Sequence, residues 1–434
     1  MLKLVSTTFF RQIFAGLCQI LTLIIIARTL NVVGMGQYTL AILIPSLLSQ
    51  VLSFGLQSAN IFSIGRKKVK ETEVLYVNLL SLLIISIIGT IGCCIFLSLY
   101  ANWAFPQIPV DLLYLATLSL IPLTFTTVLP SILQATQKFN IFNIICILQP
   151  VIMLLVTLGI IIFYSDILSM LYAYTLANFI TFFIIIIILL KNIEIKTYSL
   201  IKFYKEFMGY SVKSHLSNIV TLLNYRSSLF ILGFFTSPAL VGIYTVGLQL
   251  VEKLWLPSQA VSTIFLPKIT HNLNEENSKD LAKATVDIAR LVFIFTFLLG
   301  FIFSLLLPIL INLFFGIEYT QSIVVALLLL PGILAWTPSR ILANDLAARG
   351  LANINLHNAC WVLLINVILS LFLIPYLGIK GAAIATSIAY SSDFLLRASA
   401  FNKVTGVKVI RNLIPQSTDL QVVKNSIKGL RNAN

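Results

Sequence analysis

The sequence predicts an all-α polytopic membrane protein: about 12 transmembrane helices in two six-helix lobes around a central cavity. Of its 434 residues, 59% are hydrophobic and only 10% are charged, whereas soluble domains carry about 25% charged residues. Apolar runs long enough to cross a bilayer recur along the chain, with short polar connections between them. Basic residues are abundant in alternate connections, which is typical of a chain that crosses a membrane repeatedly.

The twelve apolar runs are each close to or above the roughly 20 residues that a helix needs to span the hydrocarbon core. They are much longer than the strands of a membrane β-barrel. The first run follows Lys3 and Arg11 and is too long for a signal-peptide core, so we expect a retained helix. The predicted spans are 9–30, 36–60, 74–101, 111–133, 140–164, 166–190, 210–235, 239–266, 287–312, 319–345, 354–375 and 379–400.

The basic residues also assign the orientation. Of the 29 Lys and Arg residues, 23 fall in the N-terminal segment, the even-numbered connections and the tail. Only Arg28 and Lys380 fall on the opposite side. Because cytoplasmic loops are enriched in Lys and Arg, both termini are predicted to be cytoplasmic. The net charge of +14 is therefore mostly a topology signal, and we expect no nucleic-acid partner.

Two short motifs recur at nearly the same offset. Gly36-Gln37-Tyr38-Thr39 opens the second predicted helix, and Gly242-Ile243-Tyr244-Thr245 opens the eighth, 206 residues later. Pro130-Ser131 recurs as Pro338-Ser339 after 208 residues. An offset of six helices preserves orientation, so the repeat is parallel. Two such halves usually enclose a cleft that opens alternately to each side of the membrane.

This repeat divides the chain into four expected segments. They are an N-terminal six-helix lobe (1–190), a cytoplasmic linker (191–209), a C-terminal six-helix lobe (210–400) and a basic cytoplasmic tail (401–434). The tail contains no run long enough to span, and its basic residues suit anionic lipid headgroups. We therefore expect the tail to be dispensable for transport.

The chemical motifs of the common enzyme classes are missing from the sequence. It contains no Walker loop, dinucleotide fingerprint, nucleophile elbow or zinc-protease motif. The five cysteines lie in apolar runs without metal-ligand spacing, and the three histidines are isolated. We predict no catalytic residues, no metal and no cofactor, and therefore a transporter rather than an enzyme.

Polar side chains recur at helical spacing in the first, second, seventh and eighth predicted helices. Because these helices are equivalent pairs in the repeat, we expect their polar faces to line one wet cavity between the halves. Gln19, Asn224 and Gln249 are the candidate substrate-binding residues among them. Helix–helix hydrogen bonding is the alternative explanation for any one residue. The polar positions are Thr8, Gln12, Gln19, Thr22, Ser46, Ser49, Ser53, Gln57, Asn60, Ser214, Ser217, Thr221, Asn224, Ser228, Thr245, Gln249, Glu252, Gln259 and Thr263.

Charges within predicted spans are a stronger functional signal, because each is costly in lipid. Arg226, Glu252, Lys253 and Arg340 are the candidates. Three basic side chains against one carboxylate predict a cationic interior suited to an anionic cargo. A guanidinium suits phosphate because its planar donors match two oxygens. Alternatively, Arg226 forms a structural ion pair with Glu252, since it lies off the polar face of its own helix.

The chain resembles the Wzx-like polysaccharide-export flippases, a branch of the superfamily that contains the multidrug-and-toxin exporters (the MOP superfamily). The resemblance covers most of residues 5–400 and implies a two-lobed, V-shaped transporter. Its implied cargo is an oligosaccharide on a polyprenyl pyrophosphate carrier, turned to the outer leaflet for surface polysaccharide assembly. The motifs that carry it are Ala27-Arg28-Thr29-Leu30, Gly36-Gln37-Tyr38, Phe54-Gly55-Leu56, Ile64-Gly65-Arg66, Asn224-Tyr225-Arg226, Val241-Gly242-Ile243-Tyr244, Glu252-Lys253-Leu254-Trp255, Leu266-Pro267, Leu373-Ile374-Pro375-Tyr376 and residues 378–386.

Two departures from the family pattern affect these expectations. The family commonly has Asp where this chain has Ser228, which puts any ion-coupling role of that Asp in doubt here. It leaves Glu252 as the only mid-span carboxylate recognised in the second half. The family also commonly has Gly where this chain has Asn31.

The leading hypothesis is therefore a lipid-linked oligosaccharide flippase in a bacterial inner membrane, working by alternating access. Its expected partners are the lipid-linked cargo, membrane lipids and a possible coupling ion, either a proton or sodium. The alternative is a cation-coupled multidrug exporter of the same fold, which would need carboxylates that this interior lacks. A membrane polysaccharide polymerase is less consistent with the short outer connections. The sequence leaves the oligomeric state open.

Overall fold

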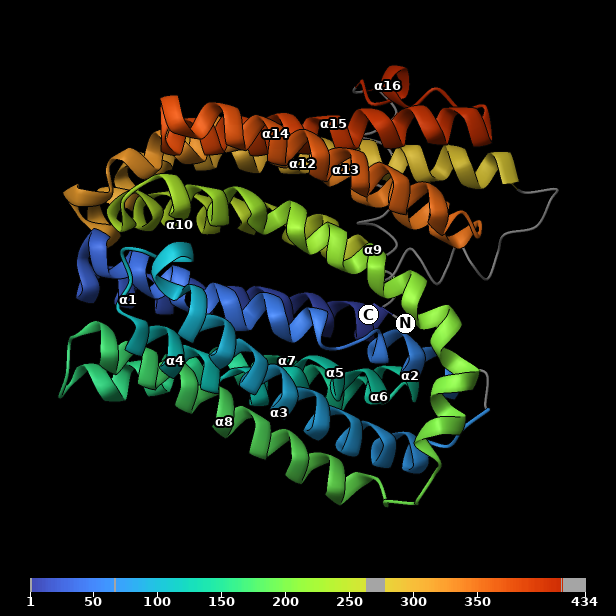
Figure 1. Cartoon of the computed structure of the whole chain (residues 1–434). Helices are drawn as coiled ribbons and strands as arrows, with labels where there is room; N and C mark the ends of the chain where they lie inside the picture. Colours follow the sequence, from blue (N-terminus) through green and yellow to red (C-terminus); the bar gives the residue numbers. More distant parts are fainter. Residues whose placement is uncertain (1, 66–67, 263–277, 415, 417–434) are drawn as a thin grey trace.

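The computed structural model describes residues 2–65, 68–262, 278–414 and 416. These residues are helical almost throughout, and they contain no β-strand. Figure 1 shows the helices running side by side in two lobes, with α1 of the first lobe beside α9 and α10 of the second. The Leu266-Pro267 motif and most of the tail lie outside the described residues.

The first lobe, called the N lobe below, contains the helices of residues 2–192. They are α1 (Leu2–Val51), α2 (Leu56–Gly65), α3 (Glu71–Ala104), α4 (Val110–Leu118), α5 (Leu120–Val128), α6 (Pro130–Ala135), α7 (Phe139–Ile161) and α8 (Ile167–Asn192).

The second lobe, called the C lobe below, contains the helices that follow residue 199. They are α9 (Leu200–Phe235), α10 (Pro238–Val251), the 3-10 turn η1 (Glu252–Trp255), α12 (Ser278–Leu310), the π-helical turn η2 (Ile311–Phe315), the 3-10 turn η3 (Ile317–Tyr319), α13 (Gln321–Ala348), α14 (Ala352–Leu377), α15 (Ile379–Thr405) and α16 (Val409–Asn412).

The predicted spans correspond to these helices. Nine stretches of the described chain are long and apolar enough to cross a membrane, and one of them, Phe10–Gly65, holds the first two predicted spans. The seventh and twelfth predicted spans are α9 and α15, which are more polar than the rest. Both contribute polar side chains to the pocket described below. The chain is therefore a twelve-span, two-lobed membrane protein, as expected.

The connection between the first two spans is much tighter than predicted. Within α1, only Asn31 leaves the helical conformation, with φ of 54°. Its Oδ1 accepts hydrogen bonds from the backbone N–H groups of Val33 and Gly34, so it caps the second half of α1. The backbone of Asn31 has φ of 54° and ψ of −173°, a region that glycine occupies far more readily than other residues. The two hydrogen bonds to its side chain hold Asn31 in this conformation.

The second predicted span is wrong in one respect, because its helix is interrupted. The helix α1 ends at Val51, and a turn with φ of 43° at Phe54 and 74° at Gly55 precedes α2. The predicted span 111–133 is likewise divided, into α4, α5 and α6. Hydropathy could not predict either break, since apolar residues continue through both turns.

The two lobes meet closely at one end of the bundle, which the topology places at the outer membrane surface. A Cβ on Gly36 would lie 1.7 Å from the carbonyl oxygen of Pro238, and one on Gly242 would lie 2.3 Å from that of Val32. The two glycines occupy equivalent places in the sequence repeat. Only residues without a Cβ permit this approach of backbone to backbone.

Hydrogen bonds to the Asn31 kink reinforce the outer contact. The Tyr319 hydroxyl donates to the carbonyl oxygens of Ala27 at 3.0 Å and Asn31 at 2.9 Å. The Arg28 guanidinium donates to the carbonyl oxygens of Leu313 and Phe314 in η2. Residues of the C lobe therefore hold the kink between the first two spans.

The buried apolar core differs between the two ends of the bundle. One large cluster joins the lobes through α1 and α10, with Leu30, Tyr38 and Val241 among its members. Toward the cytoplasmic end, one cluster forms around Leu129 of the N lobe and includes Phe203 and Phe207 of α9, and another forms around Leu342 of the C lobe. The lobes are thus packed together at the outer end, whereas at the cytoplasmic end the start of α9 packs on the N lobe and α12, α13 and α15 have a core of their own.

The orientation can be tested by labelling single cysteines introduced into a cysteine-free background. Gln107 and Ser237 are exposed in the outer connections, and Thr197 is exposed in the linker between the lobes. Cysteines at the first two positions should react with a membrane-impermeant maleimide on intact cells. A cysteine at Thr197 should react only after permeabilisation. Labelling at Thr197 from outside would overturn the topology.

The segment expected to be dispensable for transport is shorter than residues 401–434, because the folded C lobe extends into it. The helix α15 continues to Thr405, and α16 packs its fully buried Val409 against Phe401 and Ala282. The Arg290 guanidinium donates a hydrogen bond to the Asn412 carbonyl oxygen at 2.9 Å. Residues 409–412 are therefore part of the folded C lobe.

We predict different effects for truncations on the two sides of α16. Ending the chain after Leu413 should leave transport and abundance near wild type. Ending it after Gly406 should lower the melting temperature, because losing the buried Val409 side chain alone removes about 1.5–3 kcal/mol of hydrophobic stabilisation. Thermal unfolding of the purified proteins measures the difference. Equal stability of the two truncations would contradict the packing role of α16.

Candidate functional site

Arg226 of α9 forms an ion pair with Glu252, which directly follows α10 in the C lobe. Arg226 Nη1 lies 3.3 Å from Glu252 Oε1, and 33% of the Arg226 side chain and 13% of the Glu252 side chain are exposed. Glu252 begins the 3-10 turn η1, where the eighth span departs from regular α-helix. The pairing that the sequence offered as an alternative is thus present, and a third of the Arg226 side chain is left exposed.

Lys253 and Gln19 connect the two lobes beside this pair. The Lys253 ammonium donates to Gln19 Oε1 at 2.7 Å. Gln19 of α1 and Gln249 of α10 both line a pocket of about 190 Å³ between α1, α7, α8 and α10. The described residues that line this pocket carry no charge. They are Gln19, Thr22, Leu23, Ile26, Met35, Tyr38, Thr39, Ile42, Gln149, Pro150, Met153, Tyr174 and Gln249.

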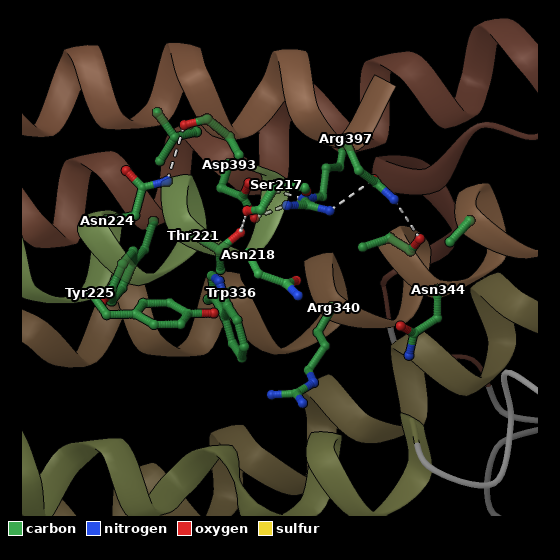
Figure 2. A pocket seen from close by; sticks show the side chains of 16 residues that line it. Ser217, Asn218, Thr221, Asn224, Tyr225, Trp336, Arg340, Asn344, Asp393 and Arg397 are labelled. Carbon is green, nitrogen blue, oxygen red and sulfur yellow. Dashed lines mark hydrogen bonds and ion pairs between the residues drawn. The ribbon is translucent and has the colours of Figure 1, made fainter. Parts of the chain in front are cut away.

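A larger pocket, of about 390 Å³, lies inside the C lobe between α9, α13, α14 and α15 (Figure 2). We call it the C-lobe pocket. Its lining is mostly polar, with several amides, three aromatic rings and three charged side chains. The residues are Ser217, Asn218, Thr221, Asn224, Tyr225, Trp336, Arg340, Ala343, Asn344, Ala347, Asn355, Ala359, Val362, Tyr390, Asp393 and Arg397.

The polar face of α9 lines this pocket and a buried network, instead of one wet cavity between the halves. Thr221 and Asn224 line the C-lobe pocket, and Asn224 Nδ2 donates to the Ala359 carbonyl oxygen at 3.1 Å. Ser228 donates to Asn366 Oδ1 at 2.9 Å within a neutral cluster. The other members of the cluster are Ser370, Thr386 and Tyr244. Of the polar positions predicted to line a cavity between the halves, Ser53 and Gln57 line a small pocket with His215 and Asn218 of α9, whereas Thr221, Asn224 and Ser228 are turned toward α14.

Arg397 and Asp393 form a buried ion pair at the back of the C-lobe pocket. Arg397 Nε lies 2.9 Å from both carboxylate oxygens of Asp393, and its Nη1 donates to Asn355 Oδ1 at 2.9 Å. Ser339 donates to the same carboxylate at 2.6 Å. Asn355 and Ser339 therefore hold the pair in place, which suits a structural role.

Arg340 differs from the other cations of the site because no carboxylate lies within ion-pair distance of it among the described residues. Its guanidinium carbon lies 5.3 Å from the centroid of the Trp336 ring, a cation–π contact. Figure 2 shows the side chain pointing away from the Asp393–Arg397 pair. Arg340 is thus a charged group held in place and available to an anion.

A cluster of four aromatic rings separates the two charged groups of the C lobe. The Trp255 and Trp336 ring centroids lie 4.6 Å apart, Tyr225 packs against both, and Tyr390 packs against Trp255 and Tyr225. Glu252 and Arg226 lie toward α10, while Arg340, Asp393 and Arg397 line the C-lobe pocket. The sequence-predicted site residues therefore fall in two places instead of one.

Comparison with known proteins identifies the family. Residues 25–324 match the model of the family described as "Polysaccharide biosynthesis protein". The chain belongs to this family. It is also similar to the capsular polysaccharide biosynthesis protein CapF of Staphylococcus aureus, with 25% identity over 398 residues, covering 90% of this chain and 96% of that protein.

Solved structures share the fold of this polysaccharide biosynthesis protein. The lipid II flippase MurJ, in an inward closed conformation, matches with a TM-score of 0.74 and 18% identity, covering 99% of this chain and 96% of that chain. A MOP superfamily transporter from Pyrococcus furiosus matches with a TM-score of 0.64 and 18% identity, covering 93% and 96%. The chain therefore has the fold of the MOP superfamily transporters, as predicted.

Sequence reasoning missed Asp393 and Arg397 of this family member. The charge count placed Arg397 with the basic residues of the tail, although this residue falls within the last predicted span. In the structure it belongs to α15, which continues to Thr405. Glu252 is consequently not the only carboxylate within the spans of the C lobe. The available signal was the spacing of Asp393 and Arg397, four residues apart in a helix, which allows a side-chain pair.

Proposed function

We propose that this polysaccharide biosynthesis protein is a flippase for polyprenyl-pyrophosphate-linked oligosaccharide, working by alternating access in a bacterial plasma membrane. The observation that carries the proposal is the excess of positive charge inside the C lobe. In the Arg226–Glu252 group and the C-lobe pocket, Arg226, Lys253, Arg340 and Arg397 outnumber the two carboxylates, Glu252 and Asp393. Charges inside spans are costly and usually functional, and these favour an anionic cargo.

The lobe geometry supports movement from the cytoplasmic to the outer leaflet. The outer contact through Gly36 and Gly242 closes one end, while at the other end α12, α13 and α15 of the C lobe have a core separate from that of the N lobe. Cargo would enter from the cytoplasmic side with its pyrophosphate at Arg226 and Lys253 and its sugars against the polar pockets. The prenyl chain would stay in lipid. Opening of the glycine contact would then release the cargo outside.

The alternative of a cation-coupled multidrug exporter is less consistent with the site. Glu252 and Asp393 are both paired with arginines. The pocket lined by Gln19 and Gln249 is neutral in the described residues. An organic cation would meet no free negative charge in either place. The neutral Ser228 cluster likewise offers no carboxylate for a coupling ion.

The experiment that tests the proposed function is a flipping assay in proteoliposomes. A short-chain polyprenyl pyrophosphate bearing a fluorescent oligosaccharide would be placed in one leaflet, and its appearance in the other leaflet would be followed by quenching. Protein-dependent flipping that an unlabelled substrate inhibits supports the proposal. Transport of ethidium without flipping of the lipid-linked saccharide would favour the exporter.

A further inference from the structure

The smaller of the two pockets described above, of about 190 Å³, is built by helices of both lobes. The helices α1, α7 and α8 of the N lobe line it together with α10 of the C lobe. We call it the interlobe pocket. The helices α1 and α10 also pack directly on one another, within the apolar cluster that joins the lobes. A guest in the interlobe pocket therefore contacts both lobes at once.

Three glutamine side chains give the interlobe pocket its polarity. Gln19 of α1 is exposed, and Gln149 of α7 and Gln249 of α10 are half-buried. Within the described chain, the amides of Gln149 and Gln249 make no hydrogen bond, and both residues keep exposed surface. Each amide offers donors and an acceptor, which matches a hydroxyl group because a hydroxyl both donates and accepts. A prenyl chain in this pocket would leave the amides unpaired, which is unfavourable.

The size and the walls of the interlobe pocket suit one sugar ring. A cavity of about 150 Å³ is large enough for a benzene ring. The volume of about 190 Å³ therefore admits a single six-membered ring and not a longer saccharide. Leu23, Ile26, Ile42 and Met153 contribute apolar walls, against which the C–H groups of a sugar ring can pack.

The interlobe pocket is neutral, and this determines which class of sugar it accepts. Its described lining contains no Asp, Glu, Lys, Arg or His. Burying an ionised carboxylate without a partner is costly, so an acidic sugar is disfavoured. A cation lies just outside, because the Lys253 ammonium donates to Gln19 Oε1 at 2.7 Å. With the pyrophosphate at Lys253, the sugar bonded directly to it falls beside the pocket.

We propose that the interlobe pocket binds an uncharged sugar ring, the one bonded directly to the pyrophosphate of the cargo. The inference rests on the proposed function and deepens it, because it names the class of sugar at this position and the residues that hold it. The bound ring adds contacts between α10 and the N lobe that a bare carrier lipid cannot make. The protein thereby discriminates carrier that bears a sugar from carrier that does not.

Flipping of three probes by the full-length protein in proteoliposomes tests the inference. Each probe is a short-chain polyprenyl pyrophosphate with a fluorophore on its prenyl end, and it bears glucose, glucuronic acid or no sugar. Wild-type protein should flip the glucose probe with a kcat/KM about tenfold above that of either other probe, the effect of a well-made hydrogen bond. Gln149→Leu and Gln249→Leu should lower the glucose probe toward the bare probe, because each removes an amide and keeps a side chain of similar size. Both variants should flip the bare probe at the wild-type rate, which shows that they are folded.

A matched substitution outside the pocket is the control. Gln134→Leu makes the same change at an exposed position of α6 and should leave all three rates unchanged. Equal flipping of the three probes by wild-type protein, or a preference for the glucuronic acid probe, would overturn the inference and leave the proposed function intact. An equal loss for all three probes in Gln149→Leu and Gln249→Leu would give the amides a structural role and overturn it as well. If the wild-type protein flips no probe, the proposed function fails, and this inference fails with it.

Discussion

Replacing Arg226 and Glu252 together by Gln is expected to give a folded protein that no longer flips lipid-linked saccharide. The charged atoms of the pair lie 3.3 Å apart, and a third of the Arg226 side chain is exposed. The contribution of the ion pair to the free energy of unfolding therefore falls between two limits. Exposed pairs contribute about 0–1 kcal/mol, whereas breaking a buried pair costs about 3–5 kcal/mol. Each single Gln variant should therefore lose about 1–3 kcal/mol of stability, because a charge is left without its partner. The double variant should recover most of it.

The transport result separates the two roles of Arg226. If the guanidinium also binds pyrophosphate, the double variant is stable but inactive. Arg226→Lys should then retain part of the flipping activity, because a charge remains without the two-pronged geometry. Melting temperature and flipping in proteoliposomes are measured on the same preparations. Wild-type flipping by the double variant would leave Arg226 a purely structural residue.

Adding a methyl group to Gly36 or Gly242 is expected to abolish flipping by opening the outer contact. The new Cβ would lie 1.7 Å from the Pro238 carbonyl oxygen in the first case and 2.3 Å from the Val32 carbonyl oxygen in the second. Both atoms belong to backbone, so no side-chain rotation relieves the clash. The two lobes must then separate at this end. Since the packing of α9 on the N lobe and the core of α12, α13 and α15 lie toward the cytoplasmic end, abundance should fall less than activity.

Two exposed positions near the contact allow this opening to be measured. Gln107 of the N lobe donates a hydrogen bond to the Thr236 carbonyl oxygen, so spin labels at Gln107 and Ser237 report the outer distance between the lobes. The distance should increase in Gly36→Ala and Gly242→Ala. Gly92→Ala is the matched control, because a Cβ there meets no atom within 4 Å. Normal flipping with an unchanged distance in Gly36→Ala would show that this contact is dispensable.

The sequence by itself determined the number of spans, their orientation and the internal repeat. These properties follow from hydropathy and charge, which act on each segment independently of its neighbours. The repeat also identified Gly36 and Gly242 as equivalent, and the structure places them at one interface. The breaks at Asn31 and at Phe54 depend on local backbone conformation, and apolar composition does not encode that.

Only the tertiary structure decided which charges are paired and which are available. Arg226 meets Glu252 and Arg397 meets Asp393, whereas Arg340 meets the Trp336 ring and no carboxylate in the described chain. Each outcome depends on how far a helix is rotated about its axis and which helix lies beside it. A rotation of about 100° per residue moves adjacent side chains from lipid to pocket. Residue types therefore predicted a cationic interior, but helix packing determined which cation is left free for a ligand.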